Sequence, residues 1–373
     1  MKEGYQVLGN YIRLVDERNR DLSVTRLLGV SIEKKFIPSI ANIVGTDLSG
    51  YKIVRTGQFA YGPVTSRNGD KISIAYLDSD DCIISSSYTA FEVKDKDNLD
   101  PEYLMLWFSR PEFDRYARYK SHGSVREIFD WNELCMVELP LPAIERQREI
   151  VKAYKAITDR IELKRRINDN LEATAQTYFD SLFFKGDRTD CTLADIAIVN
   201  PVRQLAKGKI ARCFEMATLP TRGCIPTGDS LKAYNGGVRF TNGDTIIARI
   251  TPCLENGKAA YINILNDGEV AFGSTEYIVF APKGKMPSCF YYFLIRNSQF
   301  VTFALQFMNG SSGRQRVSGE ELASFPLLSP SETDLKAFEK VGSMVLEKMK
   351  QHTEEILLLQ QLRETITATL SSR

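Results

Sequence analysis

One uninterrupted run of helix-forming residues constrains this chain more than any other feature. Between Pro142 and Gly186 there is neither proline nor glycine, so a single helix of about 40 residues, roughly 60 Å long, can form from Ala143 to about Lys185. Its apolar residues recur at alternating steps of four and three, the heptad spacing of a helix that buries one stripe against another long helix. The expected seam consists of Ile150, Tyr154, Ile157, Ile161, Leu171, Ala175, Tyr178 and Leu182, interrupted by polar Lys164 and Asn168.

The C-terminal stretch 331–373 repeats this register. Adding 188 to each seam position gives Phe338, Gly342, Val345, Met349, His352, Ile356, Leu359, Arg363, Ile366 and Leu370, so that polar Lys164 corresponds to polar His352. We expect the two helices to pair antiparallel as an intramolecular coiled coil that holds two globular bodies apart. The alternative is that each helix packs only on its own domain.

The same offset extends through the rest of the chain and indicates a tandem duplication. Asn68-Gly69 corresponds to Asn256-Gly257, Phe113 to Phe300, and Leu139-Pro140-Leu141 to Phe325-Pro326-Leu327, at shifts of 186 to 188 residues. The predicted organisation is therefore a first globular domain (1–142), a first long spacer helix (143–187), a second globular domain (188–330) and a second long helix (331–373).

Each globular half is expected to have a mixed α/β (α+β) fold. Short apolar runs bounded by Asn-Gly, Asn-Asp-Gly and Asp-Ser-Asp turns predict strands at 71–77, 82–86, 245–249 and 277–281. One helix is expected in each half, at 100–119 and at 286–308, followed by a polar glycine loop.

Composition favours an ordinary soluble, cytoplasmic protein. Hydrophobic residues make up 43% and charged residues 25% of the 373 residues, and no apolar run approaches the ~20 residues of a membrane span. The early charges argue against a secretory signal, and seven scattered cysteines without a CxxC pair favour a reducing compartment. With a net charge of +1, any nucleic-acid surface has to be a local patch.

No catalytic or metal-binding motif stands out. There is no GxxxxGK[ST] phosphate loop, and no cysteine or histidine lies at metal-ligand spacing to His122 or His352. Asn200-Pro201-Val202-Arg203 lacks the second proline and the aromatic residue of a methyltransferase loop. We interpret it as a loop after a strand, and Asp80-Asp81 as a turn. The chain is predicted to be non-catalytic and to bind no cofactor or metal.

Two pairs of polar loops remain as candidates for binding. Arginine can form two hydrogen bonds with guanine, glutamine or asparagine with adenine, and serine hydroxyls suit phosphate oxygens. For any single loop a solvated turn is the simpler interpretation, and the recurrence of both loops in the two halves puts binding on an equal footing with it. The candidate DNA contacts are Tyr61, Ser66, Arg67, Asn68, Lys71, Lys120, Ser121, His122, Ser124 and Arg126 in the first half, and Arg249, Asn256, Lys258, Ser311, Ser312, Arg314, Gln315 and Arg316 in the second.

In this order and spacing, the motifs resemble the specificity subunit of a Type I restriction–modification system over the full length of the chain. The resemblance is carried by the tandem halves, by the junction ELPLPAIERQREIV leading into RIELKRRINDNLEATAQ, and by the loops RITPCLENGK and GSSGRQRVS. The second junction, Ser329 to Asp334, lacks the Glu-x-Gln of the first.

The resemblance implies a function and a set of partners. Each globular half would be a target recognition domain that reads one half of a bipartite, asymmetric site in double-stranded DNA, and the coiled coil would set the unread gap between the half-sites. Two modification subunits would dock on the chain and methylate adenine with S-adenosylmethionine. Restriction subunits would add ATP-driven translocation and cleavage.

Two other interpretations remain open at this stage. One is a specificity subunit without active partners. The other is a coiled-coil scaffold or adaptor whose globular ends bind proteins. Neither the recognised bases nor the length of the gap follows from the sequence.

Overall fold

A computed structural model describes residues 4–39, 45–66, 68–122, 127–184, 190–311 and 313–370. The chain forms two compact units, Met1–Asp159 together with Gln360–Arg373, and Arg160–Leu359. We call them unit 1 and unit 2. Among the described residues, no helix combines the length and apolarity that crossing a membrane requires.

Unit 1 is built on a four-stranded antiparallel sheet of order β2-β9-β6-β7. Its strands are β2 (Ile12–Val15), β9 (Thr89–Val93), β6 (Phe59–Tyr61) and β7 (Ile74–Tyr76). Three two-stranded sheets accompany it: β1 (Tyr5–Val7) with β10 (Glu138–Pro140), β3 (Leu28–Val30) with β4 (Phe36–Pro38), and β5 (Lys52–Val54) with β8 (Cys82–Ile84). The helical elements are the 3-10 turn Leu8–Asn10, α1 (Pro101–Phe108), α2 (Pro111–Lys120) and α3 (Trp131–Cys135).

Unit 2 repeats this plan with a second antiparallel sheet, β12-β19-β16-β17. Its strands are β12 (Ala197–Val199), β19 (Tyr277–Pro282), β16 (Thr245–Ala248) and β17 (Ala259–Tyr261), and β11 (Cys191–Thr192) pairs with β20 (Pro326–Leu327). The helices are α5 (Leu193–Ile196), α6 (Cys289–Arg296), α7 (Ser298–Gln306) and α8 (Gly319–Ala323). A further four-stranded sheet is added: β14 (Ser230–Ala233), β13 (Ile210–Phe214), β18 (Ala271–Gly273) and β15 (Val238–Phe240), in that order.

Aromatic side chains fill the core of each unit between its main sheet and one helix, α1 in unit 1 and α6 in unit 2. In unit 1, Phe59 stacks on Phe91 with ring centroids 4.9 Å apart, and Phe108 meets both rings edge-on. In unit 2, α6 is buried along almost its whole length, from Cys289 to Ile295. Edge-to-face aromatic pairs of this kind add roughly 0.5–1.5 kcal/mol each beyond the burial of their area.

The single helix predicted in each half is divided into two. In unit 1 the break falls before Pro111, which occupies the first turn of α2, because proline has no N–H to continue the preceding helix. In unit 2 the break falls at Asn297, whose side chain accepts hydrogen bonds from the backbone N–H groups of Gln299 and Phe300 and so caps α7. The prediction of one continuous helix at these positions was wrong, although both regions are helical.

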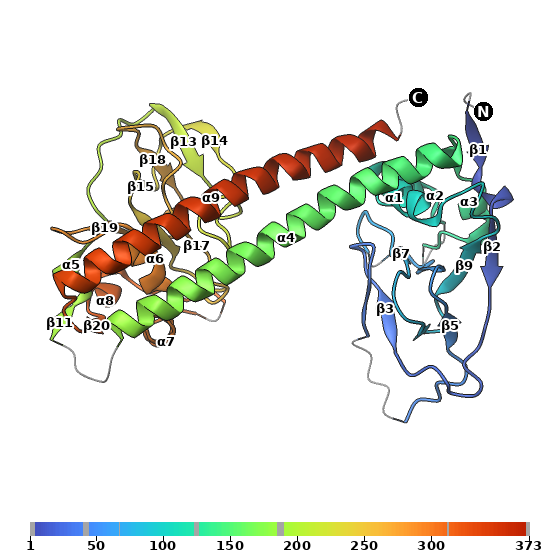
Figure 1. The fold of residues 1–373 in the computed structure, drawn as a ribbon, viewed down its shortest axis with the longest axis horizontal. Helices are drawn as coiled ribbons and strands as arrows, with labels where there is room; N and C mark the ends of the chain where they lie inside the picture. The colour runs from blue at the N-terminus through green and yellow to red at the C-terminus, as the bar shows by residue number, and fades with distance from the viewer. Residues whose placement is uncertain are drawn as a thin grey trace. The chain divides into compact units, whose positions relative to one another are not determined.

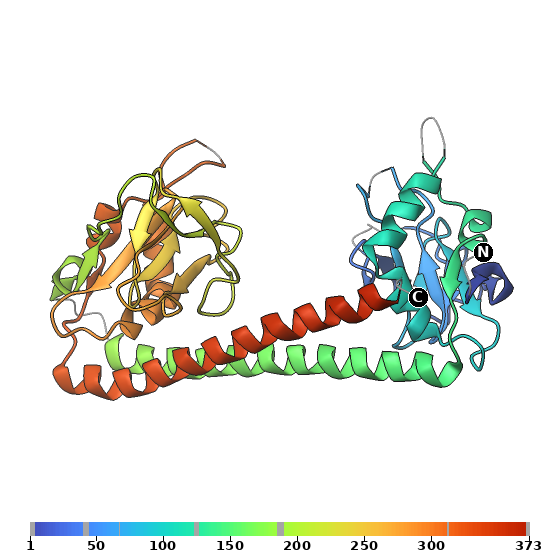
Figure 2. The same ribbon diagram turned by 90° about the horizontal axis from the view of Figure 1, so that it is seen from above.

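The two long helices form as predicted. α4 runs from Ile144 to Phe183 and α9 from Glu332 to Thr369. Within unit 2 they lie side by side (Figures 1 and 2), and the pairs Arg160–Glu355, Asn168–His352 and Tyr178–Phe338 show that they are antiparallel. The alternative in which each helix packs only on its own half is excluded here, because α9 contacts α4 directly.

The buried face of α9 follows the predicted heptad register. Its buried residues include Phe338, Gly342, Val345, Met349, His352 and Ile356. On α4, Ile161, Asn168 and Ala175 are buried, whereas Ile150, Tyr154, Ile157, Leu171 and Tyr178 are half-buried, as are Leu359 and Ile366 of α9. Phe179 and Phe183, outside the predicted seam, are more deeply buried than Tyr178 because they pack on Phe290 of α6.

The Glu-x-Gln motif at the first junction has a structural role. Gln147 is fully buried; its amide donates to the carbonyls of Asn98 and Pro142 and accepts from the N–H of Asp100, all within 3.0 Å. It thereby fixes the start of α4 against the start of α1. The corresponding residue in the second half is Leu335, also buried, so an apolar contact replaces the polar link.

Candidate nucleic-acid interface

In each unit the two candidate loops lie next to each other, joined by backbone pairing. We call them A1 (residues 62–71) and B1 (121–128) in unit 1, and A2 (249–258) and B2 (309–316) in unit 2. Val64 of A1 bridges Ile128 of B1, and Ile250 of A2 bridges Arg316 of B2. Segments that are about 60 residues apart in the sequence therefore form one platform in each unit.

The pairings themselves repeat at the offset seen in the sequence. The N–H of Thr65 donates to Glu127 at 2.9 Å, and the N–H of Thr251 donates to Gln315 at 3.0 Å. Loop B1 closes on itself through His122 and Ile128, and loop B2 closes through Asn309 and Arg316. The duplication thus extends to the hydrogen bonds that shape the loops.

Loop B2 is anchored by an ion pair at its C-terminal end. The Arg316 guanidinium donates to both carboxylate oxygens of Glu276 at 2.8–3.0 Å, and Arg249 Nε lies 3.8 Å from the same carboxylate. Hydrogen bonding from Arg316 lowers the pKa of the Glu276 carboxyl below its ordinary value. Two of the predicted DNA contacts, Arg249 and Arg316, are therefore engaged inside the protein and fix the loop.

Arg314 and Gln315 differ from Arg249 and Arg316 in that their backbone is fixed while their side chains are not paired with Glu276. The backbone of Gln315 is held at both its N–H and its carbonyl by Thr251, and the Arg314 carbonyl accepts from Arg316 at 3.0 Å. Within the described part of the chain, neither side chain has a hydrogen-bond partner, and Arg314 is exposed. Two side chains able to read bases, exposed Arg314 and half-buried Gln315, thus extend from a fixed backbone, which is the arrangement that direct readout needs.

Glycine is required at the start of this loop. Gly310 has φ +127°, and a Cβ there would lie 3.1 Å from the carbonyl oxygen of Arg314. The tight return of B2 therefore depends on the absence of a side chain.

The remaining candidates of unit 2 divide between exposed and anchored side chains. Asn256 and Ser311 are exposed. Lys258 donates to the carbonyl of Met216 at 2.6 Å and is half-buried. Ser312 lies outside the described residues.

In unit 1, Tyr61 is not available to a ligand. Only 1% of it is exposed, and its ring packs edge-on against Phe91 and Phe129 in the core. Its assignment as a DNA contact has to be corrected, because the alternation along β6 turns the side chain inward. Burial also raises the pKa of its hydroxyl.

The other described candidates of A1 differ in exposure and in their partners. Ser66 and Lys71 are exposed. Lys71 pairs with Glu33 at 3.0 Å, and the Asn68 amide donates to the Val64 carbonyl at 3.3 Å. Arg67 lies outside the described residues.

Loop B1 begins with a capped helix end. Ser121 Oγ donates to the Ala117 carbonyl at 2.7 Å, and Lys120 pairs with Glu133 at 3.3 Å, a contact that raises the pKa of the lysine. His122 is 71% exposed. Ser124 and Arg126 lie outside the described residues.

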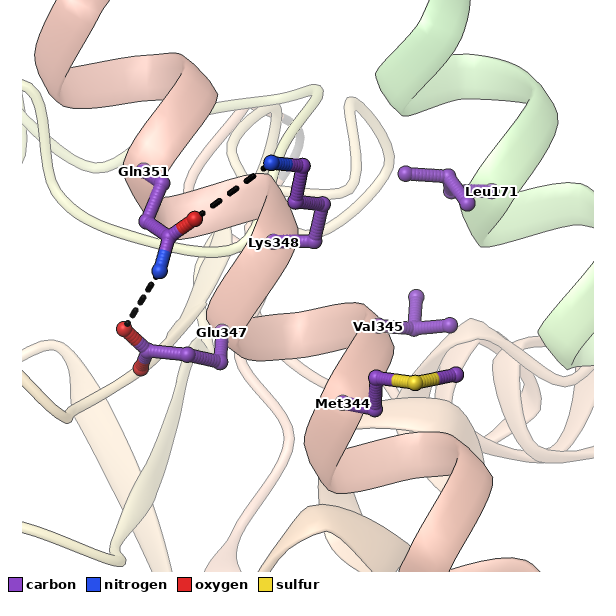
Figure 3. Close-up of a pocket in the computed structure, with 6 residues that line it drawn as sticks. All are labelled: Leu171, Met344, Val345, Glu347, Lys348 and Gln351. Carbon is purple, nitrogen blue, oxygen red and sulfur yellow. Dashed lines mark hydrogen bonds between the residues drawn. The ribbon is translucent and has the colours of Figure 1, made fainter.

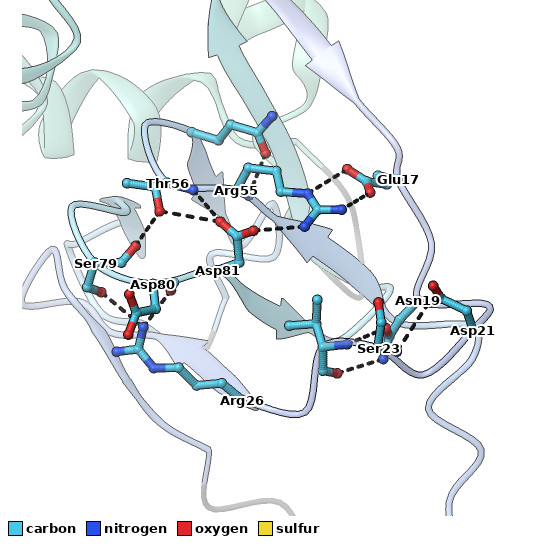
Figure 4. A network of polar contacts seen from close by, with 12 residues as sticks. Glu17, Asn19, Asp21, Ser23, Arg26, Arg55, Thr56, Ser79, Asp80 and Asp81 are labelled. Atoms are coloured by element: carbon cyan, nitrogen blue, oxygen red, sulfur yellow. Dashed lines mark hydrogen bonds and ion pairs between the residues drawn. The ribbon is translucent and has the colours of Figure 1, made fainter.

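The two motifs interpreted as structural have internal partners. Asp81 accepts from the Thr56 N–H and from Arg55, both at 2.8 Å, and Arg26 donates to the carbonyl of Asp80 (Figure 4). Asn200 follows β12 and accepts from the N–H of Val279 at 3.0 Å. Both stretches serve as turns that tie strands together.

The helix pair carries an exposed apolar groove in unit 2. It is lined by Leu171 of α4 and by Met344 and Val345 of α9, with Glu347, Lys348 and Gln351 along one side (Figure 3). An adjoining hollow of about 700 Å³ continues along Ile167, Thr174, Tyr178 and Val341. Met344 is 65% exposed, so this surface offers apolar area to another helix.

Comparison with known proteins agrees with the resemblance inferred from the sequence. Residues 46–173 match the family model of the Type I restriction modification DNA specificity domain. Two Escherichia coli proteins are similar to the chain: the Type I restriction enzyme EcoEI specificity subunit, 29% identical over 48% of this chain, and the EcoAI specificity subunit, 33% identical over 36%. These matches span 32% and 24% of the relatives' own lengths.

A solved structure shows the same fold. The crystal structure of a Type-I restriction-modification system S subunit from M. genitalium superposes with a TM-score of 0.61, covering 98% of this chain and 95% of that one at 14% identity. The predicted fold class, two similar mixed α/β halves with two long paired helices, is confirmed. The resemblance to Type I specificity subunits is likewise confirmed.

Proposed function

We propose that this chain is a non-catalytic DNA-specificity subunit of a Type I restriction–modification system, and that loops A1 and B1 read one part of a bipartite target while A2 and B2 read the other. The observation that carries the proposal is the recurrence of the same paired loops, with the same backbone hydrogen bonds, in both halves. A packing role alone does not require both copies to keep polar side chains on fixed, exposed loops. Asymmetry of the target follows from the different side chains of the two loop pairs.

Affinity and selectivity come from different residues in this proposal. Exposed serines and lysines near the loops contact phosphates, which position the chain without reading sequence. Arg314 and Gln315 are the base readers of the second half-site, because their side chains are free while their backbone is fixed. The corresponding readers of the first half-site belong to A1 and B1.

The paired helices α4 and α9 act as the spacer and as the docking surface for the modification subunits. A stiff spacer lets two weak readers engage one duplex at high effective concentration only when the gap between the half-sites fits. The apolar groove along Leu171 and Met344 suits helices of a partner. Methyl transfer with S-adenosylmethionine, and ATP-driven translocation and cleavage, reside in the modification and restriction subunits.

Salt titration tests the proposal against the scaffold alternative. The chain is co-produced with its modification subunits, and binding to a 50-base-pair duplex carrying the methylated motif is measured between 50 and 200 mM salt. We expect a steep loss of affinity with salt from counterion release, together with preference over a duplex of scrambled sequence. A complex that forms but shows no sequence preference at any salt concentration would exclude sequence recognition and favour the scaffold alternative.

A further inference from the structure

A buried arginine outside the candidate loops hydrogen-bonds to the backbone of loop A2. Arg296 is the last residue of α6, and its side chain is 15% exposed. Its Nη1 donates to the Gly257 carbonyl at 2.6 Å, and its Nη2 donates to the Gly223 carbonyl at 3.3 Å. One planar guanidinium therefore joins the C-terminal end of A2 to the segment beside it.

The other edge of the guanidinium is tied to α4. Its Nε lies 3.4 Å from Glu172 Oε1, and its plane faces the ring of Tyr292 at 5.3 Å. The Tyr292 hydroxyl lies 2.7 Å from the Glu172 carboxylate and 3.1 Å from the Gly223 carbonyl, and can donate to either. The arginine is thus fixed on both sides before it reaches the loop.

Loop A2 packs closely against the guanidinium of Arg296. A Cβ at Gly257 would lie 3.1 Å from Arg296 Nη1, and the backbone there has φ +70°. Beyond Gly257 the chain enters β17, whose first residue, Ala259, donates to the carbonyl of Pro220 at 3.1 Å. The positions of exposed Asn256 and half-buried Lys258 therefore depend on where the guanidinium holds the glycine between them.

We propose that Arg296 is a positioning residue for sequence reading: it does not touch DNA, but it sets the geometry of loop A2 and, through Thr251, of Gln315 in loop B2. This inference rests on the proposed DNA-reading function. Recognition of a base edge requires the side chain to be held within about 0.5 Å of its working position. Lysine at 296 keeps the charge but not the planar fork, so it cannot hold the two carbonyls in the same geometry.

The contacts of Arg296 occur in one half of the chain only, so a change at this residue should act on one half-site. At the shift of 187 that relates Phe113 to Phe300, residue 296 corresponds to Ser109, and adding 188 to 172 gives Gln360. Unit 1 therefore lacks this arginine and its carboxylate partner at the corresponding positions. A change at Arg296 should alter one half-site and leave the other as it was.

The chain offers a matched control in Arg110. This residue is 5% exposed, lies over the ring of Trp107 at 5.0 Å and pairs with Glu112, so it resembles Arg296 in burial and aromatic contact. No hydrogen bond joins its side chain to a candidate loop among the described residues. Replacing it reports the general cost of disturbing a buried arginine.

The test compares Arg296→Lys, Tyr292→Phe and Arg110→Lys in the chain co-produced with modification subunits. Binding is measured on duplexes substituted at each base of both half-sites, and thermal unfolding is recorded in parallel. Arg296→Lys should lose discrimination by about fivefold or more at one or two bases of one half-site. Tyr292→Phe should affect the same bases more weakly, and Arg110→Lys should leave both half-sites unchanged.

Each result separates this inference from the proposed function. Unchanged discrimination in a folded Arg296→Lys chain, or an equal loss at both half-sites, would overturn the positioning role while leaving the DNA-reading function intact. If Arg296→Lys does not fold, the milder Tyr292→Phe decides the question on the same criterion. Parent protein that discriminates no base at all would overturn the proposed function itself.

Discussion

The ring nitrogen Nδ1 of His352 lies 2.8 Å from the side-chain oxygen of Asn168, across the interface between α9 and α4. Asn168 also donates to the Met349 carbonyl at 3.4 Å, and one turn away Lys164 and Arg160 share Glu355. A polar layer thus interrupts an otherwise apolar seam. Such layers favour one register of a helix pair, because any slip leaves buried polar groups without partners.

This layer predicts a pH-dependent stability. Burial, followed by the charges of Lys164 and Lys348, lowers the pKa of His352 below its ordinary value of 6.5. The unfolded chain therefore takes up a proton at a higher pH than the folded one, so the contribution of this group to stability is present above about pH 6.5 and is lost as the pH falls. Glu355, whose carboxyl has a lowered pKa, titrates below this window.

The measurement is the thermal unfolding midpoint between pH 7.5 and 5.5. The decrease should be smaller in His352→Gln than in the parent protein. His122→Gln, at an exposed position, serves as the control and should follow the parent. Equal pH dependence in all three proteins would mean that His352 does not contribute to the pH dependence of stability.

A second prediction concerns the start of α4. Gln147→Ala removes the buried amide that hydrogen-bonds three backbone groups, those of Asn98, Asp100 and Pro142, and should destabilise unit 1 by about 2–4 kcal/mol. Chemical denaturation measures the loss. Arg146→Ala, which removes only an exposed ion pair with Glu149, should cost less than about 0.5 kcal/mol. A comparable cost for both variants would mean that the buried amide contributes nothing specific.

A third prediction addresses docking of the modification subunits. Met344→Asp places a charge in the apolar groove that contains Leu171 and Val345, and it should weaken assembly tenfold or more because the charge loses its hydration in the complex. Lys340→Glu, on the exposed face of the same helix, should assemble normally. Analytical ultracentrifugation of the co-purified subunits measures both. Full assembly of Met344→Asp would place the docking surface elsewhere.

A fourth prediction concerns base reading in the second half-site. Arg314→Ala or Gln315→Ala should relax selectivity at one or two bases by about 1–3 kcal/mol. Arg316→Lys, which alters the ion pair with Glu276, should weaken binding without a change of preferred base. Competition binding with singly substituted duplexes separates the two effects. An unchanged preference in both alanine variants would rule out loop B2 as a reader.

Much of the fold follows from the sequence because its signals are periodic. The heptad spacing and the offset of 188 residues predict α4, α9 and the duplication, and together they place His352 at a seam position. The breaks before Pro111 and at Asn297 are single-residue effects within helical regions, and length and periodicity alone do not locate them.

The site was harder to predict because loop side chains depend on partners from distant segments. Glu276 engages Arg316 and Arg249, yet it has no counterpart at the expected offset, where Tyr88 stands, so the duplication gave no signal for it. Tyr61 alternates into the core, a direction that follows only once the strand register is known. In the sequence, Arg296 looks like the polar last residue of a helix. Its role becomes evident only from the close contact between its guanidinium and Gly257.

The most direct measurement of the central claim is sequencing of methylated bases in a host that carries this chain and its partner subunits. The parent chain is compared with a variant that has seven extra residues in α4 after Asn168 and seven in α9 before His352. The matched insertions keep the heptad register and lengthen the helix pair by roughly 10 Å, about three base-pair steps. The account predicts a motif of two specified parts whose bases stay the same while the unread gap grows. A single contiguous motif, or an unchanged gap at full affinity, would contradict it.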